Sequence, residues 1–568
     1  MGTKNNSSAQ LRLLRPNLCS AVVSRLSLSA AEVQTHPVSI DSAGSIHSIR
    51  NEVLSSEPFS VPNSSELEGL PVSSQQSPSV PFATGSTTIV AAILVVAAAF
   101  ALLKFLFRPK PGISGLPKCD ERICSHEAAA STHAKLGDVF TARGFDGKQA
   151  VFVRGAEAVS VLSKQGFGSG KWGSGTGAPA ATTPMAVPSN LMQPMALGSF
   201  IHAEGAGWKA TRTALRKLFA PSANTAPEAA ECADLATLPT GGATDAQALT
   251  HAALRDTMLR LNVGGNATSA RGKPVEDAFV ALEHVCNEWR GDLSLQHASE
   301  MTPPVAAACE DAMRACRVAA KDAIAAAAAG DAAAAGCLAA MLHASLRKEG
   351  SSDDSALEEV ARTVFNLVVA GAESNAISTA KTLAAVATQP ALMARLRAEV
   401  DAALPPGTPP NAVTCALLRK TSTPLLDACV REGLRLYAPA TAVQRVAGGD
   451  LHLGGGFVPA GTTLCVCINA LHMDERVWQQ PAAFDPERFM GAPTKRPAHA
   501  WLPFSTGPRR CPGEVVAMLQ ARAMIARTVQ RFAVTAAAPV PVAHVAGFTE
   551  WSPAGVPLHL APREAAAP

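Results

Sequence analysis

One loop near the C-terminus decides how the chain is organised: Phe504-Ser505-Thr506-Gly507-Pro508-Arg509-Arg510-Cys511-Pro512-Gly513. A helix is predicted to begin directly after it, at Glu514. Helix N-termini carry partial positive charge and free N–H donors, which favour the thiolate form of a nearby cysteine. Gly513 has no side chain, so a flat group can lie close to the backbone there. Arg509 supplies a charge suited to a carboxylate, and Phe504 is placed to shield the sulfur.

A lone cysteine beside a glycine is more often a small buried side chain than a ligand. This loop differs because five constrained positions coincide in the order F-x-x-G-x-R-x-C-x-G: Phe504, Gly507, Arg509, Cys511 and Gly513. The pattern resembles the haem-binding loop of the cytochrome P450 family. The resemblance implies a haem b cofactor held by these residues, with Cys511 as the proximal iron ligand, whose thiolate favours O–O cleavage.

Two upstream segments resemble the family's contacts to the haem propionates. Trp208 and Arg212 are four residues apart on one face of a predicted amphipathic helix over 208–219, and they resemble the family's W-x-x-x-R motif. Without the resemblance they would be interpreted as a packed tryptophan and a surface arginine. Arg445, in a predicted strand over 442–446, resembles a second propionate contact.

The longest predicted helix, residues 355–388, carries Ala370-Gly371-Ala372-Glu373-Ser374 at its centre. A glycine costs a helix about 1 kcal/mol relative to alanine, and a buried acid costs more. Together they predict a local opening of the helix over a site. The stretch resembles the family's A-G-x-[D/E]-T motif, which implies that Glu373 and Ser374 relay protons. Ser374 lacks the methyl group that restricts the rotamer of the usual threonine. The efficiency with which electron use is coupled to product formation is therefore open.

A charge network is predicted around Glu432 and Arg435, which stand at i and i+3 on a predicted helix over 425–437. Alone they would be a common surface pair. They resemble the family's E-x-x-R motif, completed by Arg488 in Phe484-Asp485-Pro486-Glu487-Arg488-Phe489. The resemblance implies a buried network that holds the segment leading to the cysteine.

The resemblance covers about residues 110–565. It implies a mainly α-helical cytochrome P450 fold with small β-sheets, in a catalytic domain over 119–565. Strand-like segments are predicted near 137–141 and 149–154. The expected architecture is this fold preceded by one transmembrane helix, as in membrane-anchored eukaryotic members of the family.

The N-terminal part is predicted to consist of an arm, an anchor and a hinge. Residues 1–80 form a disordered arm whose basic, serine-rich start is also typical of a transit peptide. Residues 87–107 form an apolar run that is long enough to span a bilayer if Lys104 snorkels. Residues 108–118 form a proline-rich hinge. Positive charge follows the run, so the catalytic domain is expected to face the cytosol or the stroma, at the endoplasmic reticulum or a plastid.

Composition limits the possible partners. The 568-residue chain has a formal net charge of +3 and no recognised nucleic-acid-binding motif, so no nucleic acid partner is expected. Its 13 cysteines show no framework spacing, which indicates mostly free thiols in a reducing compartment.

The resemblance, together with the apolar run, implies a membrane-bound haem-thiolate monooxygenase that inserts one oxygen atom from O2 into an apolar substrate of the lipid, sterol or terpenoid kind. A flavin reductase or a ferredoxin is expected to donate electrons. Two alternatives stay open: an isomerase or dehydratase acting on a peroxide, and a haem-binding carrier or sensor without turnover. The Glu373–Ser374 pair argues against the first, and the complete motif set argues against the second.

Two further groups of residues carry predictions about binding. The sequence does not identify the substrate, because the candidate pocket residues are almost all apolar and suit many apolar molecules. These residues are Phe365, Val368, Val369, Ala440, Thr441, Val443 and Phe548. A basic patch for an acidic electron donor is predicted from Lys209, Arg216, Lys217, Lys495, Arg496 and Arg510.

Overall fold

The computed structural model describes residues 112–123, 126–144, 149–163, 205–219, 243–290, 303–405, 408–409, 412–413, 416–447, 449–491, 496–507, 509–540, 544–545, 550–552 and 554–563. The predicted arm (1–80) and anchor (87–107) lie outside these residues, as do Lys495, Pro508 and Phe548. Among the described helices, none has the length and apolar character needed to cross a bilayer. The anchor therefore stays a prediction.

Part of the predicted hinge is described, and it is attached to the domain that follows. The backbone N–H of Ser114 donates to the carbonyl of Phe457 (3.1 Å), and that of Phe457 donates back (2.8 Å). This part of the segment is therefore held to a strand of the domain by an isolated bridge.

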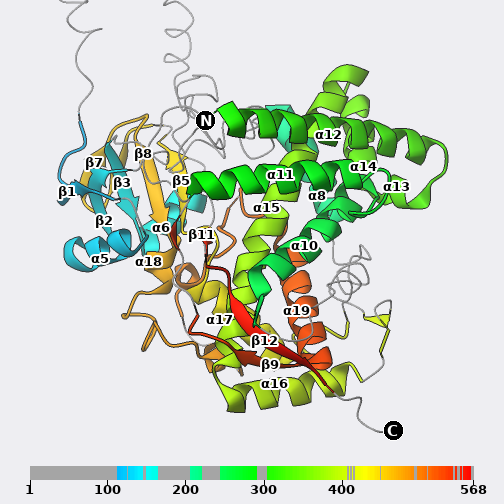
Figure 1. Ribbon diagram of the computed structural model, residues 1–568. Helices are drawn as coiled ribbons and strands as arrows, with labels where there is room; N and C mark the ends of the chain where they lie inside the picture. The colour runs from blue at the N-terminus through cyan, green and yellow to red at the C-terminus, as the bar shows by residue number, and fades with distance from the viewer. Residues whose placement is uncertain are drawn as a thin grey trace, which may run out of the picture. The chain divides into compact units, whose positions relative to one another are not determined.

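The described residues are mainly α-helical with small sheets, as predicted (Figure 1). The longest helix, α15 (Asp353–Ala387), contacts α10 (Ala246–Val263), α12 (Pro303–Ala328), α14 (Leu338–Lys348), α17 (Pro424–Leu436) and α19 (Glu514–Arg531). The other helices are α5 (His126–Leu136), α6 (Ala156–Ser163), α8 (Gly205–Leu218), α11 (Lys273–Arg290), α13 (Ala332–Gly336), α16 (Pro390–Ala403) and α18 (Ile468–His472), with the 3-10 helices η5 (Pro486–Phe489) and η6 (Ala498–Ala500).

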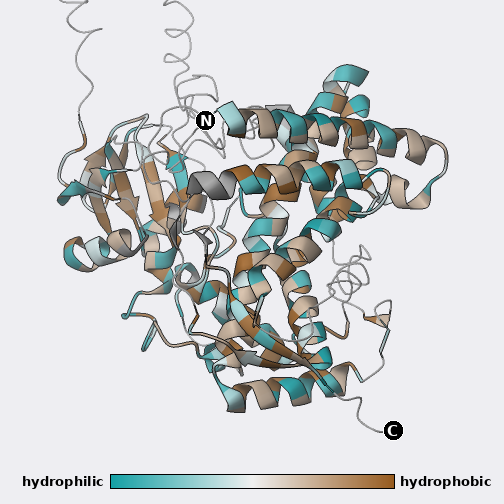
Figure 2. Ribbon diagram, in the orientation of Figure 1, coloured by the Kyte–Doolittle hydropathy of each residue, from teal (hydrophilic) through white to brown (hydrophobic). Residues whose placement is uncertain are grey.

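Local sequence explains where the central helix begins and why it is stable. The side chain of Ser352 caps α15 by accepting the N–H of Ser355, and Asp353 and Asp354 lie in its first turn, where they complement the helix dipole. Most of the helix beyond its first turns is buried. Apolar side chains predominate among its buried residues, and polar side chains such as Asn375 and Thr382 are buried with them, so the helix is coloured in both teal and brown in Figure 2.

The largest sheet has the strand order β1-β2-β3-β8-β5. Its strands are β1 (Lys118–Arg122), β2 (Val139–Arg143), β3 (Gln149–Val153), β8 (Thr463–Cys467) and β5 (Ala442–Val446). Strands β2 and β3 are antiparallel, β3 and β8 are parallel, and β5 and β8 are antiparallel with Arg445 opposite Leu464. The three strands predicted from the sequence are therefore confirmed, each within about two residues.

Three smaller sheets complete the described fold. A three-stranded sheet has the order β4-β12-β9, and β6 pairs with β7 and β10 with β11. Their bounds are β4 (Ala243–Asp245), β6 (Leu451–Leu453), β7 (Gly456–Val458), β9 (Phe532–Ala536), β10 (His544–Val545), β11 (Glu550–Trp551) and β12 (Pro557–Pro562).

Two apolar clusters hold the helices together. One joins the first half of α15 to α8, α10, α11, α12 and α14, and the other joins its second half to α16, α17 and α19. The second cluster contains Met518 and Leu519, which lie in the first turns of the helix that follows the cysteine. Burial of these side chains therefore fixes the C-terminal end of the cysteine loop.

Candidate functional site

The cysteine loop is closed by its own backbone. The N–H of Cys511 donates to the carbonyl of Phe504 (2.9 Å), and that of Arg510 donates to the carbonyl of Gly507 (3.0 Å). Gly507 has φ +77°, a conformation that glycine adopts without steric cost. Gly513 caps α19 with its carbonyl, which accepts the N–H of Ala517 (2.8 Å). The sulfur is thus presented at the start of a helix, as the sequence predicts.

The ionisation of Cys511 differs from the prediction. Burial is the largest influence and raises the pKa of the thiol; the N–H of Gly513 and the charges of Arg212 and Arg510 lower it, but do not compensate. The N–H at the start of α19 and the two guanidinium charges therefore act in the predicted direction, but the surrounding protein atoms oppose them and the pKa of the thiol is raised. A bound metal cation would reverse the balance, since a coordinating thiol is deprotonated.

The sulfur is nonetheless accessible. Protein atoms crowd the region around Cys511, but its side chain is exposed. A β-carbon built at Gly513 would meet nothing nearer than the Cys511 sulfur, at 3.9 Å. The backbone at Gly513 therefore leaves room for a flat group beside the thiol, as predicted.

Three arginines from separate elements gather around this loop. The guanidinium of Arg509 lies over the ring of Trp208 on α8, 4.4 Å from its centre. Arg212, one turn further along α8, lies close enough to Cys511 for each to shift the pKa of the other. Arg445 on β5 is buried, and burial and the charge of Arg509 lower its pKa to about 10.

This arrangement fits haem b. Like charges held together in a desolvated place repel one another, so the three arginines favour an anionic partner. Haem carries two carboxylates, and arginine is the residue best suited to bind carboxylates. Cys511 supplies an accessible sulfur ligand for the iron, and Gly513 leaves space beside it. Trp208, Arg212, Arg445, Arg509, Phe504, Gly507 and Gly513 are thus the residues that would hold the cofactor.

The predicted charge network is present as a buried cluster. Arg435 donates to both carboxylate oxygens of Glu432, each at 2.8 Å, and both side chains are fully buried. Arg488 Nε lies 3.3 Å from Glu432 Oε1. Arg435 also donates to the carbonyls of Pro481 (2.7 Å) and Ala483 (3.1 Å). Because these bonds join α17 to residues 481–483, the network ties that loop to the helix.

The centre of α15 differs from the prediction of an opened helix. Residues 353–387 are helical without interruption. Gly371 is needed there for packing, because Met258 of α10 occupies the space where its side chain would be. Ser374 Oγ donates to the carbonyl of Ala370 (2.6 Å), so the hydroxyl is bonded within its own helix. A serine hydroxyl in that position bends a helix slightly and does not break it.

Two of the predicted pocket residues belong to the packed core. Phe365 and Val368 are fully buried, and the ring of Phe365 lies 5.2 Å from that of Phe279 on α11. Val369, Ala440, Thr441 and Val443 are only partly buried.

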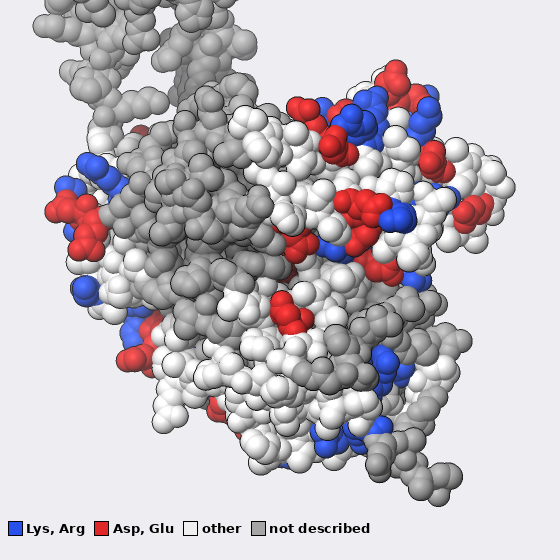
Figure 3. Space-filling view, viewed as in Figure 1, with Lys and Arg blue, Asp and Glu red and all other residues white. Residues whose placement is uncertain are grey.

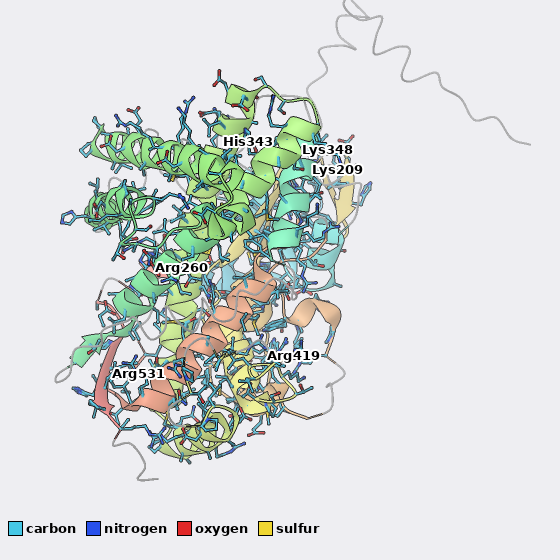
Figure 4. All side chains as sticks on the ribbon, turned by 90° about the vertical axis from the view of Figure 1, so that its right-hand side faces the viewer. Lys209, Arg260, His343, Lys348, Arg419 and Arg531 are labelled. Carbon is cyan, nitrogen blue, oxygen red and sulfur yellow. The ribbon has the colours of Figure 1, made fainter. Side chains whose placement is uncertain are left out.

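The predicted basic patch is smaller than expected. Arg496 packs over the rings of Trp478 and Phe489, with its guanidinium 4.7 and 5.1 Å from their centres. Arg510 is ion-paired with Glu514 (2.6 Å). The remaining described members, Lys209, Arg216 and Lys217, are exposed on α8, where Figure 4 labels Lys209. On the face drawn in Figure 3, by contrast, acidic and basic side chains are intermixed over α11 and α12.

Several contacts of the site were not predicted. They include Arg509 over Trp208, Met258 against Gly371, and a buried bond between the side chains of Asn375 on α15 and Gln520 on α19 (3.1 Å). The sequence carries a signal for one of them, because an arginine and a tryptophan in two motifs of one site are candidates for stacking.

Comparison with known proteins identifies the region that holds most of this site. The family profile "Cytochrome P450" matches residues 324–544. Cytochrome P450 3A5 of Homo sapiens is 32% identical over 178 residues, which are 31% of this chain and 34% of that protein. Cytochrome P450 3A13 of Mus musculus is 34% identical over 189 residues, which are 33% of this chain and 36% of that protein. A lithocholate 6-beta-hydroxylase of Mesocricetus auratus is 33% identical over 186 residues, which are 33% of this chain and 36% of that protein.

These matches cover about a third of the length of each of these relatives. The matched part of the chain is similar to the cytochrome P450 family, and it contains α15, α17, the cysteine loop and α19. Members of this family are monooxygenases that bind haem b through a cysteine.

Proposed function

We propose that the protein is a membrane-anchored haem-thiolate monooxygenase that inserts one oxygen atom from O2 into an apolar substrate. The observation that carries the proposal is the convergence of Cys511, Trp208, Arg212, Arg445 and Arg509 from three separate parts of the chain. The haem, when bound, supplies the oxidative chemistry. The chain's own residues hold it, orient the substrate and move protons.

The residues have distinct roles in this proposal. Cys511 binds the iron as a thiolate, and Arg212, Arg445 and Arg509 neutralise the two propionates. Glu373 and Ser374 lie together on α15, which packs against α19. Rotation of Ser374 about its Cα–Cβ bond would release its hydroxyl from Ala370 and make it available as a proton donor.

Substitution of the ligand tests the proposal. Cys511→Ala should abolish the far-red-shifted carbon monoxide difference band that a thiolate ligand gives. Cys429, buried on α17, offers a matched control, and Cys429→Ala should keep the band. Persistence of the band in the Cys511→Ala protein would show that another residue binds the iron. Consumption of NADPH and O2 with an added substrate would distinguish a monooxygenase from a peroxide isomerase and from a carrier.

The substrate is proposed only as a class. Apolar residues predominate among the predicted lining positions that are partly buried, namely Val369, Ala440, Thr441 and Val443. One relative is named as a hydroxylase of lithocholate. Both observations support a lipid, sterol or terpenoid substrate.

The electron donor is proposed to dock on α8. Lys209, Arg216 and Lys217 are exposed there, on the helix that also carries Trp208 and Arg212. A flavin reductase or a ferredoxin with an acidic surface would match them. Lys217→Glu should slow reduction at low salt, whereas Lys321→Glu, at an exposed lysine of α12, should not. Equal reduction rates in the two variants would remove α8 as the docking site.

The membrane and the compartment rest on residues outside the described part of the chain. The apolar run 87–107 supports an anchor at the endoplasmic reticulum or a plastid, with the catalytic domain toward cytosol or stroma. A fluorescent fusion of residues 1–118 would distinguish the two compartments.

A further inference from the structure

His472 is fully buried at the end of α18, between α17 and the segment that leads into the cysteine loop. Its Nδ1 lies 3.0 Å from the carbonyl oxygen of Arg435, and the backbone nitrogen of Leu502 lies 2.9 Å from its Nε2. A carbonyl only accepts and a backbone N–H only donates, so the ring must carry its proton on Nδ1 and accept at Nε2. The contacts therefore define one neutral tautomer.

His472 and Arg435 of the charge network are joined by two hydrogen bonds, and each residue donates one of them. Its ring donates to the carbonyl of Arg435, and the guanidinium of Arg435 donates to the carbonyl of His472 (2.9 Å). Arg435 is also paired with Glu432. The position of the imidazole is therefore set by a fully buried ion pair.

At its other end the ring holds the start of the cysteine loop. Leu502, which donates to Nε2, also accepts the N–H of Ser505 (3.0 Å). The adjoining Phe504 accepts the N–H of Cys511 (2.9 Å). A continuous series of hydrogen bonds and short backbone links thus runs from Arg435 through His472 to the cysteine.

A second bond joins α17 to this segment. Trp501 Nε1 donates to the carbonyl of Arg431 (3.2 Å). That bond is made by a side chain, so it restrains the backbone of Trp501 only through the rotamer of the ring. The bond from Leu502 to His472 is made by the backbone itself, so it restrains the path of the chain directly.

We propose that His472 is a positioning residue that transmits the placement of the Glu432–Arg435 pair to the cysteine loop and so orients the Cys511 sulfur toward the haem iron. The inference rests on the proposed function, because the bound haem reports the orientation. The role requires a neutral ring, since a protonated Nε2 would face the N–H of Leu502. Burial and the nearby charge of Arg435 lower the pKa of His472 to about 3, so the ring stays neutral near pH 7.

Three substitutions separate the two ends of the ring. His472→Gln places an amide oxygen near the position of Nε2 and keeps an acceptor for Leu502. His472→Asn places an amide N–H near the position of Nδ1 and keeps the donor to Arg435. His472→Phe removes both. His133 is the matched control, because it is also fully buried and bonds a carbonyl through Nδ1 (Gly137, 2.9 Å), but that carbonyl belongs to the residue that follows α5 and not to the charge network.

The full-length holoprotein is used, and the thiolate-type carbon monoxide band is measured per bound haem. We expect His472→Phe and His472→Asn to lose at least half of that band, and His472→Gln to keep most of it. His133→Phe should keep the band while lowering thermal stability. If His472→Phe does not fold, the comparison of Gln with Asn carries the test.

Two results would overturn the inference. One is an undiminished band in His472→Phe at a reduced melting temperature, which would make the residue purely structural. The other is a band kept in full by both the Gln and the Asn variants, which would show that the bond to Leu502 does not position the loop. Absence of the band from the unmodified protein would instead contradict the proposed function.

Discussion

Gly371 of α15 lies directly against the side chain of Met258 in α10: a β-carbon at position 371 would stand 2.6 Å from Met258 Cε and 2.7 Å from its sulfur. Real β-carbons do not approach other atoms so closely, so the glycine permits the contact of these two helices. Met258 is almost fully buried and has little room to withdraw. The glycine that resembles part of a proton-delivery motif thus also has a packing role.

We predict that Gly371→Ala lowers the free energy of unfolding. Alanine favours the helix by about 1 kcal/mol, but forcing a methyl group into a packed core typically costs about 1–3 kcal/mol. In a Met258→Ala background the clash is absent, so the same substitution should become stabilising. Urea unfolding of the four proteins measures this change of sign, and a uniform effect of Gly371→Ala in both backgrounds would contradict the packing explanation.

Loss of charge at Glu432 should be strongly destabilising. Glu432→Gln leaves Arg435 buried without a counter-charge, which typically costs about 3–5 kcal/mol. The exposed pair Lys273–Asp277, with both side chains 61% exposed and 2.8 Å apart, is the control. Asp277→Asn should cost less than about 1 kcal/mol. Chemical denaturation of both variants tests the contrast, and similar losses would show that burial of the pair is unimportant.

Two fully buried histidines should make the protein sensitive to acid. Burial lowers the pKa of His472 to about 3 and that of His133 to about 4. An unfolded histidine titrates near pH 6.5, so below that pH the unfolded chain binds protons that the folded chain does not. The free energy of unfolding should therefore fall as the pH drops from about 6.5 to 4.

The contribution of one histidine to this slope is measurable. His133→Phe should remove up to about 1.4 kcal/mol per pH unit from the slope between pH 6 and 4.5. His559, which is exposed on β12, is the control, and His559→Phe should leave the slope as it is. Denaturation at several pH values gives both slopes; equal slopes for the two variants would show that the burial of His133 has no effect on acid stability.

Glu359 on α15 should have the opposite dependence on pH. Burial raises the pKa of this carboxyl to about 7, against the attraction of Arg362. Its contribution to stability is therefore complete below about pH 4.5 and is lost as the pH rises through 7. Glu359→Gln should raise the free energy of unfolding at pH 8 by about 1–3 kcal/mol and have little effect at pH 5.

The neighbouring acid supplies the comparison for this prediction. Glu358 is ion-paired with Arg317 (3.2 Å) and Arg362 (3.1 Å), so Glu358→Gln should not be stabilising at pH 8. Thermal unfolding at the two pH values measures both variants. A Glu359→Gln protein that is no more stable than the unmodified one at pH 8 would show that the carboxyl is not desolvated.

The hydroxyl at position 374 should control the coupling of electron use to product formation. Ser374→Ala removes it, so more of the consumed electrons should appear as peroxide. Ser374→Thr adds the methyl group that restricts the rotamer and should reduce peroxide severalfold. The ratio of peroxide to NADPH consumed measures this effect at unchanged haem content. Ser378, buried one turn further along α15, is the control, and an equal effect of Ser378→Ala would remove the special role of Ser374.

Much of the fold and of the candidate site was predictable because its signals are local. A spacing of three or four residues places Glu432 beside Arg435 and Trp208 on the face of Arg212, whatever the rest of the chain does. Apolar periodicity likewise gave the extents of α8, α15 and α17 to within a few residues. The order of these elements along the chain was sufficient to indicate the family.

By itself, then, the sequence determined where α8, α15, α17 and α19 and the strands β2, β3 and β5 form, and which residue types each presents. Only the tertiary structure decided the packing of Met258 against Gly371, the stacking of Arg496 on Trp478, and the partners of His472. It also decided that the protein atoms around Cys511 raise the pKa of its thiol despite the opposing N–H of Gly513. Each of these depends on atoms from distant parts of the chain, and desolvation depends on everything that surrounds a group, which no local pattern encodes.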